Sequence, residues 1–240
     1  MIGAFKDYVA NYDLTNDKIN TKFNHSIRVM NLSKKYAKKL GFNNQDIKIA
    51  SQIGLLHDIG RFEQIRIYNT YNDSESIDHA DLGVKILFRD NVISKFDIDK
   101  NGYQLIKVAI KNHNKYAIES GLSEKELLHA KLIRNMDKID ILYIYSSLIE
   151  LTTTEDEISP LVLKKIKNNE CVQNDDRRNI NDQIASYFAF CFDIYNQECL
   201  YEAKKYVTKI YEKLNHKEKF TEIYNLVINY IDERNDENAR

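Results

Sequence analysis

Residues that interrupt helices are scarce in this chain. Its 240 residues include one proline and seven glycines. This scarcity leaves room for long helices, and no segment alternates strictly between apolar and polar residues as a half-buried strand would. Hydrophobic residues make up 43% of the chain and charged residues 30%, a composition typical of folded globular proteins rather than disordered ones. We therefore expect an all-α fold.

Long apolar runs and an excess of charge of one sign are also missing. Lys6 and Asp7 already interrupt the first residues, and no run is long enough for a signal peptide or a membrane span. The three cysteines lack CxxC spacing and are most simply reduced thiols. The formal net charge is −1, which gives no global attraction toward nucleic acid. We expect a cytoplasmic protein that binds neither membranes nor nucleic acid.

Apolar residues recur with helical period through most of the first 150 residues. The helices we expect cover residues 23–40, 44–56, 76–87 (with a start at Asp73 as the alternative), 103–110 and 123–148. Gly41 is a natural stop after the first of these helices. Asn44 can cap the second helix, and Ser123 followed by Glu126 is a capping-box pattern at the head of the last one.

After Leu151 the composition changes. Residues 152–182 are polar and contain the only proline, Pro160. We expect this segment to be an irregular insertion or a partial lid. Two further helices are expected, roughly over residues 182–214 and 217–233, and both are rich in tyrosine and phenylalanine.

Aromatic residues in this last part indicate how it packs. Phe188, Phe192 and Tyr195 recur at spacings of four and three, which is one face of a helix. We expect this face to pack on the rest of the domain, and a homodimer surface is the alternative use for it. The boundaries we expect are 1–240 for a single helical domain, about 20–150 for its core, 152–182 for the insertion and 183–235 for the C-terminal helices.

Histidine is the scarce residue that carries the chemistry. The chain has six histidines, and four of them lie in separate segments that we expect to be helical. With two aspartates, the candidate set is His25, His57, Asp58, His79, His113 and Asp137. Imidazole and carboxylate ligands suit a mid-to-late first-row divalent ion, and six such ligands are enough for two ions. Taken singly, each histidine could instead be an ordinary core or surface residue, so the prediction depends on the set.

The residues before Asp58 support its prediction as a metal ligand. His57 and Asp58 follow a strongly apolar segment, residues 53–56, so both polar side chains should lie near buried surface. A buried carboxylate without a partner is costly, and a metal ion keeps it ionised. Gly60 then lets the backbone leave the helix.

These residues resemble the HD-domain superfamily of metal-dependent phosphohydrolases. The stretch His57-Asp58-Ile59-Gly60-Arg61 matches the central motif of that superfamily. Residues 136–140 resemble its closing aspartate segment, and residues 78–83 resemble the extra-histidine segment of two-metal members. The resemblance implies an all-α bundle in which one ion is held by His25, His57, Asp58 and Asp137. In dinuclear members, Asp58 would bridge the ions and His79 and His113 would hold the second one.

The chain departs from parts of the family pattern. Asn112-His113-Asn114 stands where two-metal members often have paired histidines. The glycine-tyrosine-proline signature of cyclic-dinucleotide phosphodiesterases is absent after His113, which argues against that subfamily.

The resemblance implies a metal-dependent phosphohydrolase that acts on a nucleotide or related small phosphate ester. Asp58 and Arg61 are the candidate catalytic residues. A phosphoryl group needs cations beyond the metal ions, and Arg61 is the first choice for that charge, with Lys115 and Lys138 as second choices. The expected cofactors are two divalent ions per chain, and the sequence does not distinguish Mn, Fe, Co, Ni, Mg and Zn. The expected partner is a small phosphorylated, nucleotide-like substrate.

Two other functions use the same residues. A di-iron oxygenase could employ all six ligands, and a non-enzymatic metal-binding module could retain the fold alone. All six ligand positions are filled, which argues against the second alternative. Metal identity and oxygen dependence separate the hydrolase from the oxygenase.

Overall fold

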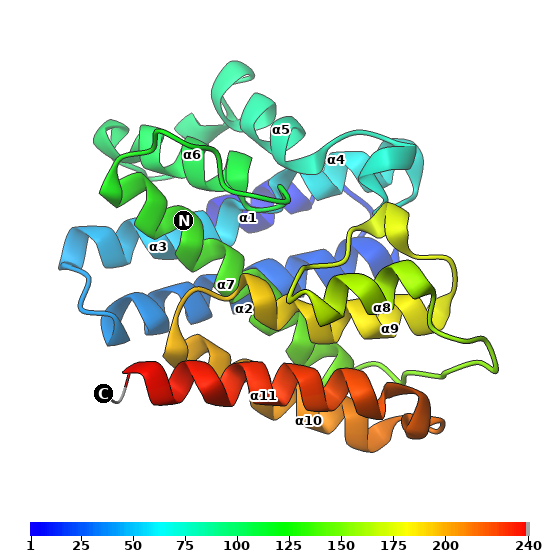
Figure 1. Cartoon of the computed structure of the whole chain (residues 1–240). Helices are drawn as coiled ribbons and strands as arrows, with labels where there is room; N and C mark the ends of the chain where they lie inside the picture. The colour runs from blue at the N-terminus through cyan, green and yellow to red at the C-terminus, as the bar shows by residue number, and fades with distance from the viewer. Residues whose placement is uncertain (239–240) are drawn as a thin grey trace. The chain divides into compact units, whose positions relative to one another are not determined.

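Helices account for the regular structure of this protein. The computed structural model describes residues 1–238, and within that range it contains helices and no strand, which confirms the all-α prediction (Figure 1). The chain divides into two compact units, residues 1–136 and 137–240. The single-domain boundaries stay a prediction.

The first unit contains six helices and the beginning of a seventh. They are α1 (Ile2–Val9), α2 (Asp17–Lys39), α3 (Asn44–Leu56), α4 (Ile59–Tyr68), α5 (His79–Val84), α6 (Tyr103–Asn112) and the start of α7 (Glu124–Ser147). Short 3-10 turns cover Asp73–Glu75, Val92–Lys95 and Lys100–Gly102, and a π-helical turn, Lys85–Arg89, extends α5. The buried faces of α2, α3 and α6 supply much of the apolar core.

Helix α2 ends as the sequence predicts. Gly41 has a φ of +75°, and its N–H donates to the carbonyl of Lys38 at 3.1 Å. The N–H of Phe42 donates to the carbonyl of Ala37 at 3.0 Å, which completes a Schellman ending. The cap of α3 is Asn43, whose side chain accepts from the N–H of Asp46, so the expected cap lies one residue too late.

Two glycines allow pairs of helices to approach closely. A Cβ at Gly54 in α3 would lie 2.7 Å from Ser33 Oγ and 2.8 Å from the Val29 carbonyl of α2. A Cβ at Gly60 would lie 2.1 Å from the carbonyl of His79. Gly60 lies inside α4, so the prediction that the backbone leaves the helix at this glycine is wrong. The missing side chain instead allows α5 to approach α4.

The segment that carries His79 starts later than expected. Asp73 begins a separate 3-10 turn, and α5 begins at His79 with Asp78 as its cap, whose side chain accepts from the N–H of Asp81 at 2.9 Å. The capping box of α7 is confirmed. Ser123 N–H donates to Glu126 Oε2 at 2.9 Å, and Glu126 N–H donates to Ser123 Oγ at 3.3 Å.

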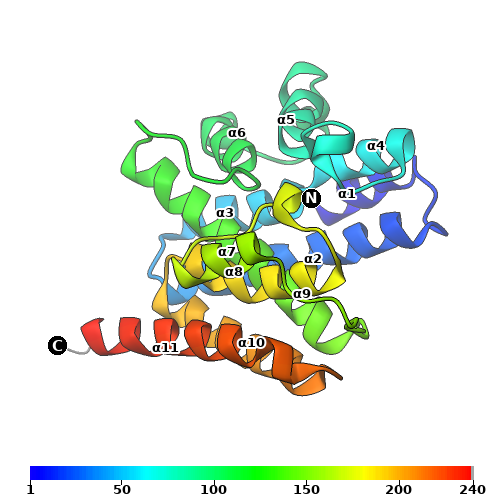
Figure 2. The ribbon, with the colours of Figure 1, turned by 45° about the vertical axis from the view of Figure 1, so that its right-hand side comes forward.

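The second unit contains the end of α7 and four further helices. These are α8 (Pro160–Lys167), α9 (Ile180–Ala189), α10 (Gln197–Lys213) and α11 (Thr221–Asn238). Helices α10 and α11 lie side by side (Figures 1 and 2). Residues 152–182 are thus not wholly irregular, because α8 lies within them, and their role as a lid stays a prediction.

The helix predicted over residues 182–214 is interrupted. A 3-10 turn, Phe190–Asp193, follows α9, and the side chain of Asn196 then caps α10 by accepting from the N–H of Glu198. The three aromatic residues expected on one helix face are consequently separated. Phe188 is buried against Phe220, and Phe192 packs on Tyr230 with 4.9 Å between ring centroids. Tyr195 lies after the turn and is exposed.

Two smaller predictions concern the whole chain. Within the described residues, no helix combines the length and the hydropathy needed to cross a bilayer. The three cysteines lie in the second unit, and none of them forms a disulfide in the part of the chain that the structure describes.

Candidate metal centre

Asp58 lies at the centre of four buried histidines. Its Oδ2 atom is 3.4 Å from Nε2 of His25 and 3.5 Å from Nε2 of His57. Its Oδ1 atom is 3.3 Å from Nε2 of His79 and 3.6 Å from Nε2 of His113. All five side chains are at most 3% exposed. Each carboxylate oxygen therefore faces its own pair of imidazoles.

Helix ends bring these residues together. His57 follows the last residue of α3, Asp58 precedes α4, His79 begins α5 and His113 follows α6, whereas His25 lies within α2. The Nε2 atoms of His25 and His57 are 3.1 Å apart, and those of His79 and His113 are 3.0 Å apart. Two groups could each hold a metal ion, and Asp58 belongs to both.

The other ring nitrogens show that three histidines are oriented for a cation. Nδ1 of His57 lies 2.9 Å from the Gly54 carbonyl, and Nδ1 of His113 lies 2.6 Å from the Ile110 carbonyl. Nδ1 of His79 lies 2.6 Å from an oxygen of Asp73. A carbonyl or a carboxylate only accepts, so we assign the proton to Nδ1 in each ring.

With the ring proton on Nδ1, the Nε2 atoms are available as metal ligands. Nε2 of a neutral, Nδ1-protonated imidazole has a lone pair and no hydrogen. When the rings of His79 and His113 are both in this form, two such lone pairs face one another 3.0 Å apart. A divalent cation is the partner that satisfies both nitrogens and the adjacent carboxylate of Asp58. The donor set therefore fits a metal.

Charges around Asp58 favour the ionised carboxylate. Burial alone would raise the pKa of Asp58, but the ammonium of Lys22 and the neighbouring histidines lower it well below its ordinary range. Lys22 Nζ lies 2.6 Å from Asp58 Oδ2. Burial lowers the pKa of His113 to about 4, which leaves this ring neutral at pH 7.

Lys22 is a site residue that sequence reasoning missed. It precedes His25 by three residues on α2, so both side chains lie on the same helix face. That spacing is the signal that could have identified it. Lys22 is only partly buried, and its ammonium also lies 5.5 Å from the centroid of the Tyr71 ring.

Arg61 lies beside the centre but makes contacts that the sequence did not predict. Its Nη1 atom donates to Gln64 Oε1 at 2.7 Å, to the Tyr71 carbonyl at 2.6 Å and to Asp73 Oδ1 at 2.8 Å. Its Nε atom is 3.7 Å from Asp58 Oδ1 and has no hydrogen-bond partner among the described residues. The phosphoryl-binding role of Arg61 stays a prediction.

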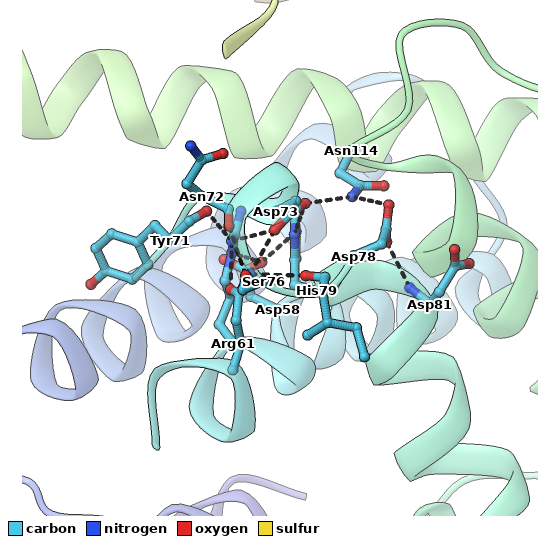
Figure 3. A network of polar contacts seen from close by, with 12 residues as sticks. Asp58, Arg61, Tyr71, Asn72, Asp73, Ser76, Asp78, His79, Asp81 and Asn114 are labelled. Carbon is cyan, nitrogen blue, oxygen red and sulfur yellow. Dashed lines mark hydrogen bonds and ion pairs between the residues drawn. The ribbon is translucent and has the colours of Figure 1, made fainter. Parts of the chain in front are cut away.

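Asp73 is the second residue that the sequence did not single out for the site. Its carboxylate lies between His79 and Arg61 (Figure 3). Burial opposes ionisation of Asp73, but the hydrogen bond and charge of His79, together with the charge of Arg61, lower its pKa well below the ordinary range. No periodic pattern identifies such a residue, because it lies in a short turn outside the main helices.

The two lysines predicted as second choices for phosphoryl charge both form ion pairs with aspartates. Lys115 is paired with Asp78 at 2.7 Å and with Asp81 at 3.0 Å. In the second unit, Lys138 is paired with an oxygen of Asp193 at 2.6 Å. Asp137 is the first residue of that unit, and its role as a ligand stays a prediction.

A comparison with protein families agrees with this geometry. Residues 23–142 match the HD domain family. The chain belongs to the HD domain family. The matched span contains all six predicted ligands, and membership places the chain in a superfamily of metal-dependent hydrolases. No curated protein and no solved structure matches the chain significantly.

Proposed function

We propose that this HD-domain protein is a phosphohydrolase that cleaves a nucleotide or a related small phosphate ester with the help of two divalent ions. The observation that carries the proposal is the carboxylate of Asp58, each oxygen of which faces two imidazole Nε2 atoms. Membership of a family made up mostly of metal-dependent phosphohydrolases supports the same reaction class.

The residues divide into two sets of ligands. His25, His57 and Asp58 would hold one ion, with Asp137 as a further ligand on the family resemblance. Asp58, His79 and His113 would hold the other. Divalent ions in such a centre supply Lewis acidity toward a phosphoryl oxygen and lower the pKa of water toward neutrality. Nitrogen and oxygen donors of this kind accept several first-row ions, so they do not select one.

Two side chains of the protein carry positive charge beside this centre. The ammonium of Lys22 contacts Asp58 Oδ2 directly, and the Nε atom of Arg61 lies near Asp58 Oδ1. When the carboxylate of Asp58 is taken up as a ligand, the partly exposed Lys22 side chain can turn to an anion instead. Charge develops on the phosphoryl oxygens during hydrolysis, so a cation placed there stabilises the transition state.

The histidines are suited to holding ions rather than to donating protons. Hydrogen bonds from Nδ1 of His57 and His113 to main-chain carbonyls keep the ring proton on the far side from Asp58. A leaving group next to Asp58 would meet only the lone-pair nitrogen of these rings.

The test is an activity screen with defined metals. Metal-free protein is loaded with Mn²⁺, Co²⁺, Ni²⁺ or Mg²⁺ and assayed with nucleotides and simple phosphate mono- and diesters. We expect metal-stimulated release of phosphate or of a nucleoside monophosphate, at the same rate with and without oxygen. If turnover stops under anaerobic conditions, or if iron proves uniquely necessary, the di-iron oxygenase alternative replaces this proposal.

A further inference from the structure

The carboxylate of Asp73 is held by four side chains. Its Oδ2 atom accepts from Nδ1 of His79 at 2.6 Å and from Nδ2 of Asn114 at 3.1 Å. Its Oδ1 atom accepts from Nη1 of Arg61 and from Nε2 of Gln64, both at 2.8 Å. Figure 3 shows Arg61, His79 and Asn114 around Asp73. Three of the four donors come from residues at or next to the metal centre.

The same contacts hold the turn that carries Asp73. Gln64 is fully buried in α4, and its Nε2 atom also donates to Ser76 Oγ and to the Ile77 carbonyl, both at 2.9 Å. Nη1 of Arg61 adds a bond to the Tyr71 carbonyl. Residues 71–77 are irregular apart from one 3-10 turn, yet α4 fixes them at several points.

The Nδ1 proton of His79 needs an acceptor from outside α5, because His79 lies at the start of that helix. His57 and His113 each donate from Nδ1 to a carbonyl three residues earlier in the same helix, at Gly54 and Ile110. His79 is the first residue of α5, so no preceding helical turn can supply such a carbonyl. Asp73 supplies a carboxylate in its place.

We propose that Asp73 is a positioning residue that fixes the proton and the orientation of the His79 ring, and so sets the affinity of the His79–His113 half of the centre for a divalent ion. This inference rests on the metal centre of the proposed function. An ionised acceptor makes a stronger hydrogen bond than a main-chain carbonyl does. It also raises the basicity of the opposite nitrogen, Nε2, which is the metal-binding atom.

The first experiment measures metal binding without any substrate. Asp73→Asn keeps the size of the side chain and removes its charge. In titration calorimetry with Mn²⁺ or Co²⁺, we expect one binding step to weaken about ten- to hundredfold. The other step should keep its wild-type affinity, because His57 and its Gly54 partner are unchanged.

Asp78→Asn is the matched control. Asp78 is adjacent to His79, caps α5 and contacts Lys115, but no hydrogen bond joins it to the His79 ring. Asparagine caps helices as well as aspartate does, so α5 should persist. We expect this variant to bind both ions as the wild type does. If Asp73→Asn also binds both ions with wild-type affinity, Asp73 serves only the fold and the inference is overturned.

The second experiment works on metal-free wild-type protein and needs no variant at Asp73. In ¹⁵N-labelled protein, His79 should occupy the Nδ1–H tautomer, with a downfield proton that exchanges slowly with water. A His79→Gln variant assigns the signal. An Nε2–H tautomer at His79 would contradict the inference. Because neither experiment measures turnover, an inactive enzyme that binds metal would overturn the phosphohydrolase proposal and leave this result standing.

Discussion

Asp58 is the residue that the two candidate metal-binding groups share. One oxygen faces His25 and His57, and the other faces His79 and His113. Lys22 and Arg61 lie on the same carboxylate. An ionised group this deeply buried is costly unless cations surround it. The carboxylate of Asp58 can therefore stay ionised in this buried position only with positive charge close to it, from side chains or from metal ions.

Removing this carboxylate should affect both ions together. We expect Asp58→Ala to abolish activity and to lower metal content more than any other single ligand substitution. The helices should survive, because apolar faces supply most of the core. Elemental analysis, phosphatase assays and circular dichroism check the three parts. A variant that keeps more than about a tenth of the wild-type rate, a loss under ~1.4 kcal/mol, would exclude the bridging role.

Removing the charge of Lys22 should weaken substrate binding without weakening metal binding. Its ammonium occupies Asp58 Oδ2, the atom that a metal ion would use. In Lys22→Met, metal affinity should therefore be equal to the wild type or higher. The KM for a phosphate substrate should rise about tenfold or more, because a charge-assisted hydrogen bond contributes roughly 1.5–3 kcal/mol.

Lys18→Met is the control for this substitution. Lys18 lies one turn earlier on α2, and its ammonium contacts the side chain and carbonyl of Asn69 rather than Asp58. Its KM and metal affinity should match the wild type. A Lys22→Met protein with weakened metal binding would show that Lys22 supports the ligands structurally and does not compete with the ion.

His129 gives a pH-dependent contribution to stability outside the metal centre. It is buried beside Phe42 and lies 3.4 Å from Asp46, with Lys125 on the same carboxylate. Burial lowers the pKa of His129 below 6.5, although Asp46 opposes the shift. The unfolded chain therefore takes up this proton first as the pH falls. The contribution of the neutral His129 ring to the free energy of unfolding is therefore complete above about pH 6.5 and is lost as the pH falls below that value.

Urea denaturation in EDTA at pH values from 5 to 8 measures this effect. Between pH 6.5 and 5, wild-type stability should fall more steeply than that of His129→Gln, by at most about 1.4 kcal/mol per pH unit. The lowered pKa of Asp46 keeps its carboxylate ionised throughout this window. His216→Gln, at a partly exposed histidine, should behave as the wild type does. Parallel curves for wild type and His129→Gln would refute the assignment.

At the scale of elements, glycines decide how closely the ligand-bearing helices approach. A Cβ at Gly60 would overlap the His79 carbonyl, which is main chain and cannot rotate away. We expect Gly60→Ala to lower the free energy of unfolding by about 3 kcal/mol or more, at or above the upper end for overpacked cores. It should also weaken metal binding, because His79 would have to move.

Gly3→Ala is a suitable comparison for Gly60→Ala. Gly3 lies in α1, and no atom lies within 4 Å of the Cβ that alanine would add. Its stability should stay within about 1 kcal/mol of the wild type, because only helix propensity changes. Chemical denaturation of both variants measures the difference. Equal stabilities for the two alanine variants would mean that α4 and α5 can separate without cost.

Periodicity was a good guide to the helices and a poor guide to what lies between them. The apolar stripe of α2, the stop at Gly41 and the capping box at Ser123 are local patterns, and the structure confirms them. The interruption after α9 was missed, because aromatic residues continue through a 3-10 turn. Close approach at Gly60 involves a helix nineteen residues later in the sequence and has no local signature.

The candidate site was predictable to a similar extent. The histidines and Asp58 could be identified as a set, because chelating residue types recur in separate helical segments. Lys22 and Asp73 could not, since lysine and aspartate are common on surfaces and only the folded chain brings them to the centre. The position of Arg61 just after the motif predicted a cation for the phosphoryl group, but it gave no sign that one of the Arg61 nitrogens contacts Asp73.

At the scale of the whole molecule, the centre links segments that are far apart in the sequence. Its candidate ligands come from α2, the α3–α4 junction, the start of α5 and the end of α6. An unfolded chain cannot hold these groups together, so metal ions that bind this centre would bind the native state selectively. Such binding raises the free energy of unfolding, by about 2.7 kcal/mol for one site at a free-ion concentration one hundred times the Kd.

Metal removal should therefore lower the thermal stability in a stepwise manner. We expect about two ions per chain in purified protein and a lower Tm after treatment with EDTA. His79→Ala combined with His113→Ala should retain one ion and show only part of the metal-dependent Tm shift, because the His25–His57 half remains. Elemental analysis and calorimetry with and without EDTA measure both quantities. If the double variant carries as much metal as the wild type, the second ion does not exist, and the two imidazole pairs around Asp58 serve a single-ion centre.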